Sequence, residues 1–137
     1  MKAYTPSLPF VTWDDQKEAH VYDAESKVKE MVAAYLEAAI WADKPEDEDW
    51  DATEWEPDIE ATAWFECCAF LKLAKWHIKG WTMEQLGHDF WLTRNGHGTG
   101  FWDRDFGTEE SRDALTMLSK VFGECSPYQY KGLLYLS

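Results

Sequence analysis

Residues 87–104 read GHDFWLTRNGHGTGFWDR, and this stretch decides the fold that the sequence predicts. Its apolar part alternates, with Phe90 and Leu92 on one side and a Trp and a Thr on the other, as side chains along a β-strand do. Asn95-Gly96 is the strongest short-range signal for a hairpin turn, and a Phe-Trp pair follows that can begin a return strand. We therefore predict an antiparallel hairpin at about 88–103.

Two amphipathic helices are predicted on the N-terminal side of this stretch. Apolar residues recur at three- and four-residue spacing over about 24–42, before Pro45, which is typical of a helix with one buried face. Pro57 suits the first turn of a second helix at about 57–79. The inner face of this second helix is expected to comprise Ile59, Ala63, Trp64, Phe65, Cys67, Cys68, Phe70, Leu71, Leu73, Ala74 and Ile78.

The remaining segments complete the predicted domain. Residues 1–22 contain two prolines and are expected to form an extended arm. A capping box at Thr82–Gln85 predicts a single helical turn that stops at Gly87. A third helix is predicted at about 109–122, and short strands turning at Lys131-Gly132 are predicted in the tail. The inner stripe of the third helix is expected to comprise Leu115, Leu118, Val121 and Phe122.

These elements predict one α+β domain over 1–137, with three main helices packed on a small antiparallel sheet. Three cysteines without a disulfide framework indicate reduced thiols and a cytoplasmic protein. No run approaches the roughly 20 apolar residues that cross a bilayer, so no membrane association is predicted. The sequence leaves the oligomeric state open.

The negative charge is concentrated in one third of the chain. Residues 14–60 hold 17 of the 26 carboxylates and only four lysines, which accounts for the whole net charge of −13. Such a field repels nucleic acid and membrane surfaces and attracts basic protein surfaces. We therefore expect no direct nucleic-acid binding and a basic protein partner.

The densest part of this charge falls in an acidic loop predicted over 43–56. Ten carboxylates lie between Asp43 and Glu60, and their mutual repulsion favours a solvated loop. Tryptophan side chains supply binding energy that exposed charges lack, although Trp50 and Trp55 can equally fold back onto the core. The predicted partner-binding residues are Glu46, Asp47, Glu48, Asp49, Trp50, Asp51, Glu54, Trp55, Glu56 and Asp58.

An alternative polar site lies in the predicted hairpin. Its glycines would let a ligand approach the backbone, and an Asp–His pair could orient an imidazole as a general base. The same groups can instead satisfy one another and the buried backbone. We find no nucleophile or phosphate-binding motif at recognisable spacing, which favours a non-enzymatic protein, and we predict no metal or cofactor. The residues of this alternative site are His88, Asp89, Arg94, Asn95, His97, Asp103 and Arg104.

The stretch at 87–104 closely resembles the GHDFWLTRNGHGxGFWDR signature of a family of small proteins encoded by bacteriophages and prophages, whose role is unassigned. Further matches to the family are Ala33–Leu36, Ala38–Ala42 and Phe122–Glu124. The resemblance implies an accessory product made in the cytoplasm of an infected bacterium, and it carries over no catalytic residues.

Charge and resemblance together lead to one leading hypothesis. The chain is expected to act by binding, with an acidic, DNA-mimic-like surface that blocks a host protein of a restriction, CRISPR or nuclease system. One alternative is a small enzyme or ligand-binding domain centred on the polar site of the hairpin. Another is a self-associating module driven by exposed tryptophan.

Overall fold

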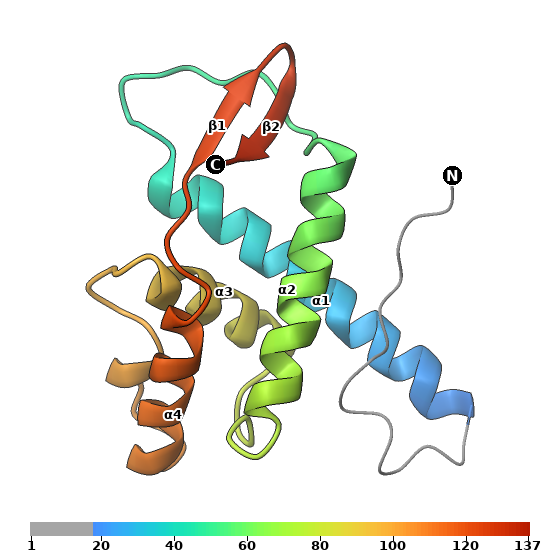
Figure 1. The fold of residues 1–137 in the computed structure, drawn as a ribbon, viewed down its shortest axis with the longest axis vertical. Helices are drawn as coiled ribbons and strands as arrows, with labels where there is room; N and C mark the ends of the chain where they lie inside the picture. The colour runs from blue at the N-terminus through green and yellow to red at the C-terminus, as the bar shows by residue number, and fades with distance from the viewer. Residues whose placement is uncertain (1–17) are drawn as a thin grey trace.

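The structure, a computed structural model, describes residues 18–137, with side chains described from Glu25 onward. It confirms a small α+β domain, which in the described residues contains four α-helices and a two-stranded antiparallel sheet (Figure 1). The elements are α1 (Glu18–Asp43), α2 (Pro57–Ala74), α3 (Met83–Arg94), the short 3-10 helix η2 (Phe101–Asp103), α4 (Glu109–Lys120), β1 (Pro127–Tyr130) and β2 (Leu133–Leu136).

The helices surround one aromatic core. Phe70 of α2 stacks on Phe90 of α3 with ring centroids 4.4 Å apart, and Tyr35 of α1 lies 5.2 Å from Phe90. Phe101 of η2 and Phe122, just after α4, pack against the same rings. Figure 1 shows the β1–β2 hairpin at one end of the molecule, beside the segment that joins α1 to α2, and α4 toward the other end.

The predicted hairpin at 88–103 is wrong, because 88–94 belong to α3 and 101–103 form η2, so neither predicted strand exists. The capping box at Thr82 starts a full 12-residue helix instead of a single turn. From Leu86 to Arg94 every residue except His88 is buried, so this part of the helix shows no exposed polar face from which a helical period could be read. Gly96, at φ +70°, directly follows the C-cap residue Asn95 in the left-handed conformation, a role that glycine fills as readily as a hairpin turn.

The prediction that Gly87 ends a helical turn is wrong, because Gly87 lies inside α3. An added Cβ there would come 2.1 Å from the Met31 carbonyl oxygen. The glycine therefore serves a close crossing of α1 and α3.

Helix bounds and faces also differ from prediction in places. Helix α1 begins at Glu18, so 18–22 are helical and not an arm, while the rest of the predicted arm lies outside the described residues. The second and third predicted helices end earlier, at Ala74 and Lys120. Three residues assigned to inner faces are exposed instead, because they lie on the solvent side of their helical turns: Phe65, Leu73 and Val121.

The strands predicted in the tail are confirmed, with Tyr128 opposite Tyr135 across the hairpin. Lys131 and Gly132 both have positive φ, at 48° and 82°, as a tight hairpin turn with two left-handed residues requires. Within residues 18–137, no helix is long and apolar enough to cross a membrane.

Candidate functional site

The acidic loop is observed at 44–56, between the end of α1 and the start of α2, and it is held against β2 at its C-terminal end. The Glu56 N–H donates to the Leu134 carbonyl and the Leu134 N–H donates to the Glu54 carbonyl, both at 2.9 Å. In the middle of the loop, the Ala52 N–H donates to Oε1 of Gln129 in β1 at 2.8 Å. The C-terminal hairpin thus positions an acidic segment that is distant in sequence.

The two tryptophans of the loop have different roles. Trp55 packs against the hydrophobic core and pairs with Leu134 as an isolated bridge. Trp50 is half-buried, and its indole Nε1 donates to Oε1 of Glu48 at 2.9 Å while Nζ of Lys44 lies 5.8 Å from its ring. Trp55 therefore secures the loop, and Trp50 stays on its surface.

All carboxylates of the loop except Glu56 are exposed. Glu56 is half-buried, because it caps α2 by accepting from the Asp58 N–H. The ion pairs among residues 25–137 are Arg94–Glu66, His97–Asp43 and Arg104–Asp89, so none includes a carboxylate between 46 and 60. The exposed acidic residues of this region are Glu46, Asp47, Glu48, Asp49, Asp51, Glu54, Asp58 and Glu60.

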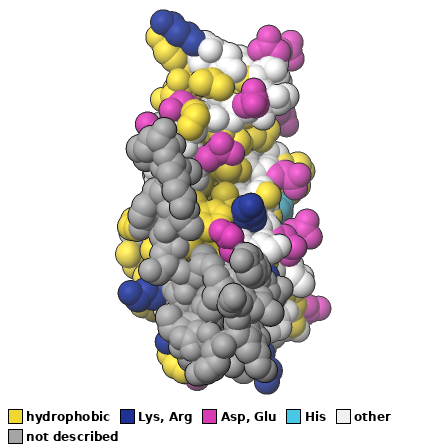
Figure 2. Space-filling model, turned by 90° about the vertical axis from the view of Figure 1, so that its right-hand side faces the viewer, with side chains coloured by type: hydrophobic (Ala, Val, Ile, Leu, Met, Phe, Trp, Pro, Cys, Tyr) yellow, Lys and Arg dark blue, Asp and Glu magenta, His cyan; other side chains and the backbone are white. Residues whose placement is uncertain are grey.

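The single cation of this segment, Lys44, also forms no ion pair with these acids in the described structure. Its Nζ donates to the backbone carbonyls of Pro45 and Glu48. Figure 2 shows Asp and Glu side chains along one edge and also across the middle of the face it displays, so carboxylates occur beyond the loop as well. The loop is nevertheless the part of the described chain where they are exposed at the highest density along the sequence.

Most residues of the alternative polar site have structural partners. Buried Arg94 donates through Nη1 to the Tyr35 hydroxyl at 2.7 Å and to Oε1 of Glu66 at 2.8 Å. It also donates to the carbonyls of Phe122 and Gly123, both at 2.7 Å. Arg94 therefore ties α1, α2 and the end of α4 together from α3.

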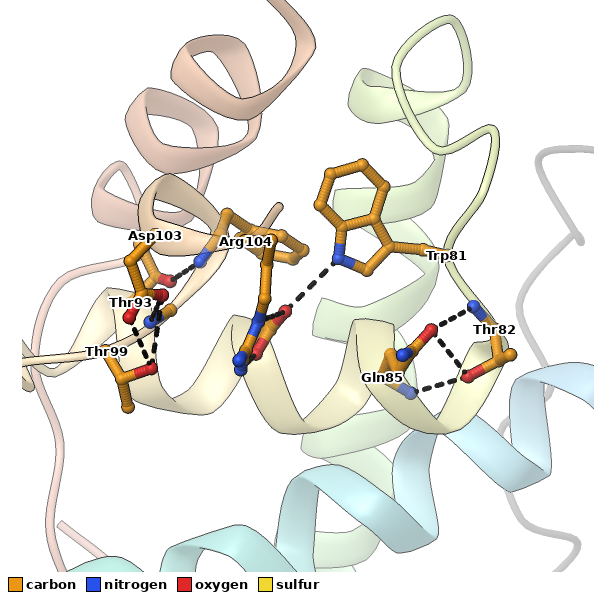
Figure 3. Close-up of polar contacts among 10 residues, drawn as sticks. Trp81, Thr82, Gln85, Thr93, Thr99, Asp103 and Arg104 are labelled. Atoms are coloured by element: carbon orange, nitrogen blue, oxygen red, sulfur yellow. Dashed lines mark hydrogen bonds and ion pairs between the residues drawn. The ribbon is translucent and has the colours of Figure 1, made fainter. Parts of the chain in front are cut away.

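A second ion pair lies near the middle of α3 (Figure 3). Asp89, 1% exposed, accepts from the Arg104 guanidinium at both carboxylate oxygens and from the Trp81 indole at 3.2 Å. Nearby, Oδ1 of Asp103 accepts from the Gly100 N–H at 3.0 Å, and the Thr99 hydroxyl donates to the same carboxylate. These bonds hold the pKa of Asp103 below its usual value, and the bond from the Gly100 N–H has the largest effect.

His97 and Asn95 join the end of α3 to other elements. Nε2 of His97 lies 2.9 Å from Oδ2 of Asp43, which also accepts from the Trp91 indole at 2.6 Å. Asn95 accepts from the Cys125 N–H and donates to the Trp91 carbonyl. Asp43, the last residue of α1, therefore joins the start of the acidic loop to α3 and to His97, and it is not one of the exposed carboxylates.

One cavity of about 670 Å³ lies among α1, α3 and the segment after η2. It brings together four residues of the predicted polar site, and Arg94, Asn95 and His97 are not among its lining residues. The ring of His88, which lines it, lies 5.4 Å from that of the largely exposed Trp41, tilted by 42°. The lining residues are Ala34, Glu37, Glu84, Gln85, His88, Asp89, Asp103, Arg104, Asp105 and Phe106.

The cysteines are poor nucleophiles in the folded protein. Burial raises the pKa of Cys68 to about 11 and also raises the pKa values of Cys67 and Cys125. A thiol attacks as its thiolate, so raised pKa values work against covalent catalysis. Within the described residues no group of three or more His, Cys, Asp or Glu side chains could hold a metal ion.

Comparisons with models of protein families, with curated proteins and with solved structures find no match to this chain.

Several residues that organise these sites were missed by the sequence analysis. Tyr35, Glu66 and Asp43 are the partners of Arg94 and His97, and each lies 28 or more positions away in sequence. The only available signal was that each is a polar group within or beside an apolar helical face.

Proposed function

We propose that this chain is a phage accessory protein that acts by binding, through its acidic loop, to a basic surface of a host protein that handles nucleic acid. The target class is a restriction, CRISPR or nuclease system, and the site of action is the cytoplasm of the infected bacterium. The observation that carries this proposal is the ordered loop whose carboxylates are exposed and free of ion pairs in the described structure.

The charge spacing supports mimicry of nucleic acid. Five carboxylates lie within the six residues 46–51, and an extended chain spans at most about 3.5 Å per residue. Residues 46 and 47 lie in a turn, so the segment is shorter than a fully extended chain and carries at least one charge per roughly 4 Å, compared with approximately 3.4 Å per charge along one DNA strand. The hydrogen bonds from β1 and β2 hold 52–56, next to this stretch, so less conformational entropy is lost there on association.

The test is displacement of a labelled 30-base-pair duplex from purified restriction, CRISPR and nuclease proteins, at low and high salt. The loop variant carries Glu46→Gln, Asp47→Asn, Glu48→Gln, Asp49→Asn and Asp51→Asn. A charge-matched control removes five acids that are exposed elsewhere, by Glu30→Gln, Glu109→Gln, Glu110→Gln, Asp113→Asn and Glu124→Gln.

We expect the natural chain and the control to displace DNA from at least one target, more weakly at high salt, and the loop variant to fail. Equal displacement by the loop variant and the control would show that the loop is not the contact. Absence of displacement from every protein of the panel would overturn the proposal.

A second candidate function, a ligand-binding site, is favoured by the cavity beside His88. Five carboxylates and one arginine line it, so its field favours a small cation. Thermal unfolding with spermidine, compared with glutarate, tests this candidate. Stabilisation by spermidine that Glu37→Gln with Glu84→Gln abolishes would support it, and equal responses to the two compounds would refute it.

A further inference from the structure

The acidic loop adds a third segment to the C-terminal hairpin. Residues 54–56 run parallel to β2, because Glu56 donates to and Glu54 accepts from the backbone of Leu134, with Trp55 as the bridge partner. On its other side β2 pairs antiparallel with β1. Three short extended segments thus form one small surface.

The two faces of this surface differ. Leu134 is 4% exposed and Trp55 packs on the core, so these paired residues mark the inner face. Since side chains alternate along extended segments, their sequence neighbours project from the outer face. Glu54 and Glu56 of the loop therefore share this face with residues of both strands: Leu133, Tyr135, Tyr128 and Tyr130. We call these six residues the tyrosine–glutamate face.

Two of the three tyrosines of this face are exposed, and the third, Tyr135, is half-buried. Tyr128 and Tyr130 are 42% and 55% exposed. Tyr135 stacks with Tyr128 at 5.2 Å, and Nζ of Lys131 lies 5.3 Å from the ring centroid of Tyr130. One ring thus already faces a cation. At the upper end of Figure 2, where Figure 1 places the hairpin, hydrophobic and carboxylate side chains occur together.

We propose that the tyrosine–glutamate face binds arginine side chains of the basic protein partner. This inference rests on the proposed function and names the chemistry that the partner must offer. A guanidinium group stacks on aromatic rings and pairs with carboxylates through a planar fork, whereas a lysine ammonium is a compact, strongly hydrated charge. The face offers rings and carboxylates side by side, which matches arginine better than lysine.

Charge complementarity decides between arginine and other occupants. An apolar partner would bury Glu54 without a cation, and an unpaired buried charge is costly. A second copy of this chain carries the same net charge of −13 and would be repelled. Nucleic acid would meet the carboxylates of the loop and be repelled. Exposed ion pairs alone contribute little, while tyrosine and arginine are enriched among residues that dominate binding energy at interfaces.

The test uses two probes, nona-arginine and nona-lysine peptides, titrated into the full chain by calorimetry at 150 mM NaCl. We expect the arginine peptide to bind at least tenfold more tightly. In Tyr128→Leu with Tyr130→Leu this preference should fall below about twofold, with binding of the lysine peptide unchanged. Tyr128→Phe with Tyr130→Phe keeps both rings and should keep the preference, and Trp76→Leu, at an exposed position on the turn after α2, is the control for loss of an aromatic side chain.

The outcomes separate this inference from the proposed function. Equal binding of both peptides by the natural chain, or a preference that survives the leucine variant, overturns the role of the tyrosine–glutamate face alone. Unchanged binding of both peptides by the five-carboxylate loop variant overturns the acidic loop as the contact. Far-ultraviolet circular dichroism of each variant confirms that it is folded.

Discussion

Gly87 of α3 lies directly against the backbone of Met31 in α1. A Cβ atom at position 87 would be 2.1 Å from the Met31 carbonyl oxygen and 2.9 Å from the Tyr35 nitrogen. The two helices can cross at this distance only because glycine has no side chain. The crossing brings Tyr35 beside Phe90 and Arg94, so it sets the centre of the core.

Replacement of this glycine should therefore be costly. We expect Gly87→Ala to lower the free energy of unfolding by about 2 kcal/mol or more, because the added methyl group must displace backbone and not a flexible side chain. Urea unfolding measures the change. Gly98→Ala is the matched control, since nothing lies within 4 Å of its added Cβ, and it should shift stability by less than about 0.5 kcal/mol. Similar losses in both variants would contradict the crossing.

Arg94 should be among the most sensitive side chains. Arg94→Met leaves Glu66, the Tyr35 hydroxyl and the Phe122 carbonyl without the donor they share, and breaking a buried pair from one side costs about 3–5 kcal/mol. Glu66→Gln keeps an acceptor at a partly exposed position and should cost roughly 1 kcal/mol. Chemical denaturation of the two variants tests the asymmetry, and equal costs would argue against it.

Replacement of the two loop tryptophans should change the free energy of unfolding by different amounts, as chemical denaturation would measure. We expect Trp55→Ala to lower the free energy of unfolding by about 2–3 kcal/mol, because Trp55 packs on the core. Trp50→Ala should change it by less than about 1 kcal/mol. Hydrogen exchange provides a second readout, with faster exchange of the Ala52 and Glu56 amides expected in Trp55→Ala only. Greater loss in Trp50→Ala would reverse the assigned roles.

Stability should fall in alkaline solution. Burial raises the pKa of Cys68 from 9.0 to about 11, so the folded state holds this proton more tightly than the unfolded state. Its contribution is fully present below pH 9 and is lost as the pH rises toward 11. In Cys68→Ala the loss between pH 9 and 11 should be smaller by roughly 2 kcal/mol, as measured by urea unfolding across pH. An identical pH dependence in both proteins would contradict the raised pKa of Cys68.

Local sequence was sufficient for several elements. The three- and four-residue spacing of apolar residues predicted the central part of α1, Pro57 marked the first turn of α2, and Lys131-Gly132 marked the turn of the C-terminal hairpin. Each of these signals lies within a few residues of the element that it predicts, and the structure places the element there. The acidic loop followed equally directly, because adjacent carboxylates repel one another and cannot pack.

Local sequence was insufficient to predict α3 and the partners of the polar side chains in 88–104. Because all residues of α3 from Leu86 to Arg94 except His88 are buried, this part lacks the exposed polar face that distinguishes helix from strand, and Asn95-Gly96 can close either structure. The polar side chains of 88–104 divide between the Arg94 cluster, the Asp89–Arg104 pair and the cavity according to partners contributed by other helices.

Sequence alone thus determined the net charge, the position of the acidic loop, most of α1 and α2, and the C-terminal hairpin, since each depends on neighbours within a few residues. Only the tertiary structure decided that 83–94 is helical, that Trp55 and not Trp50 secures the loop, and that Glu54 lies on one face with Tyr128 and Tyr130. These outcomes depend on contacts between segments far apart in the chain, where packing outweighs local preference.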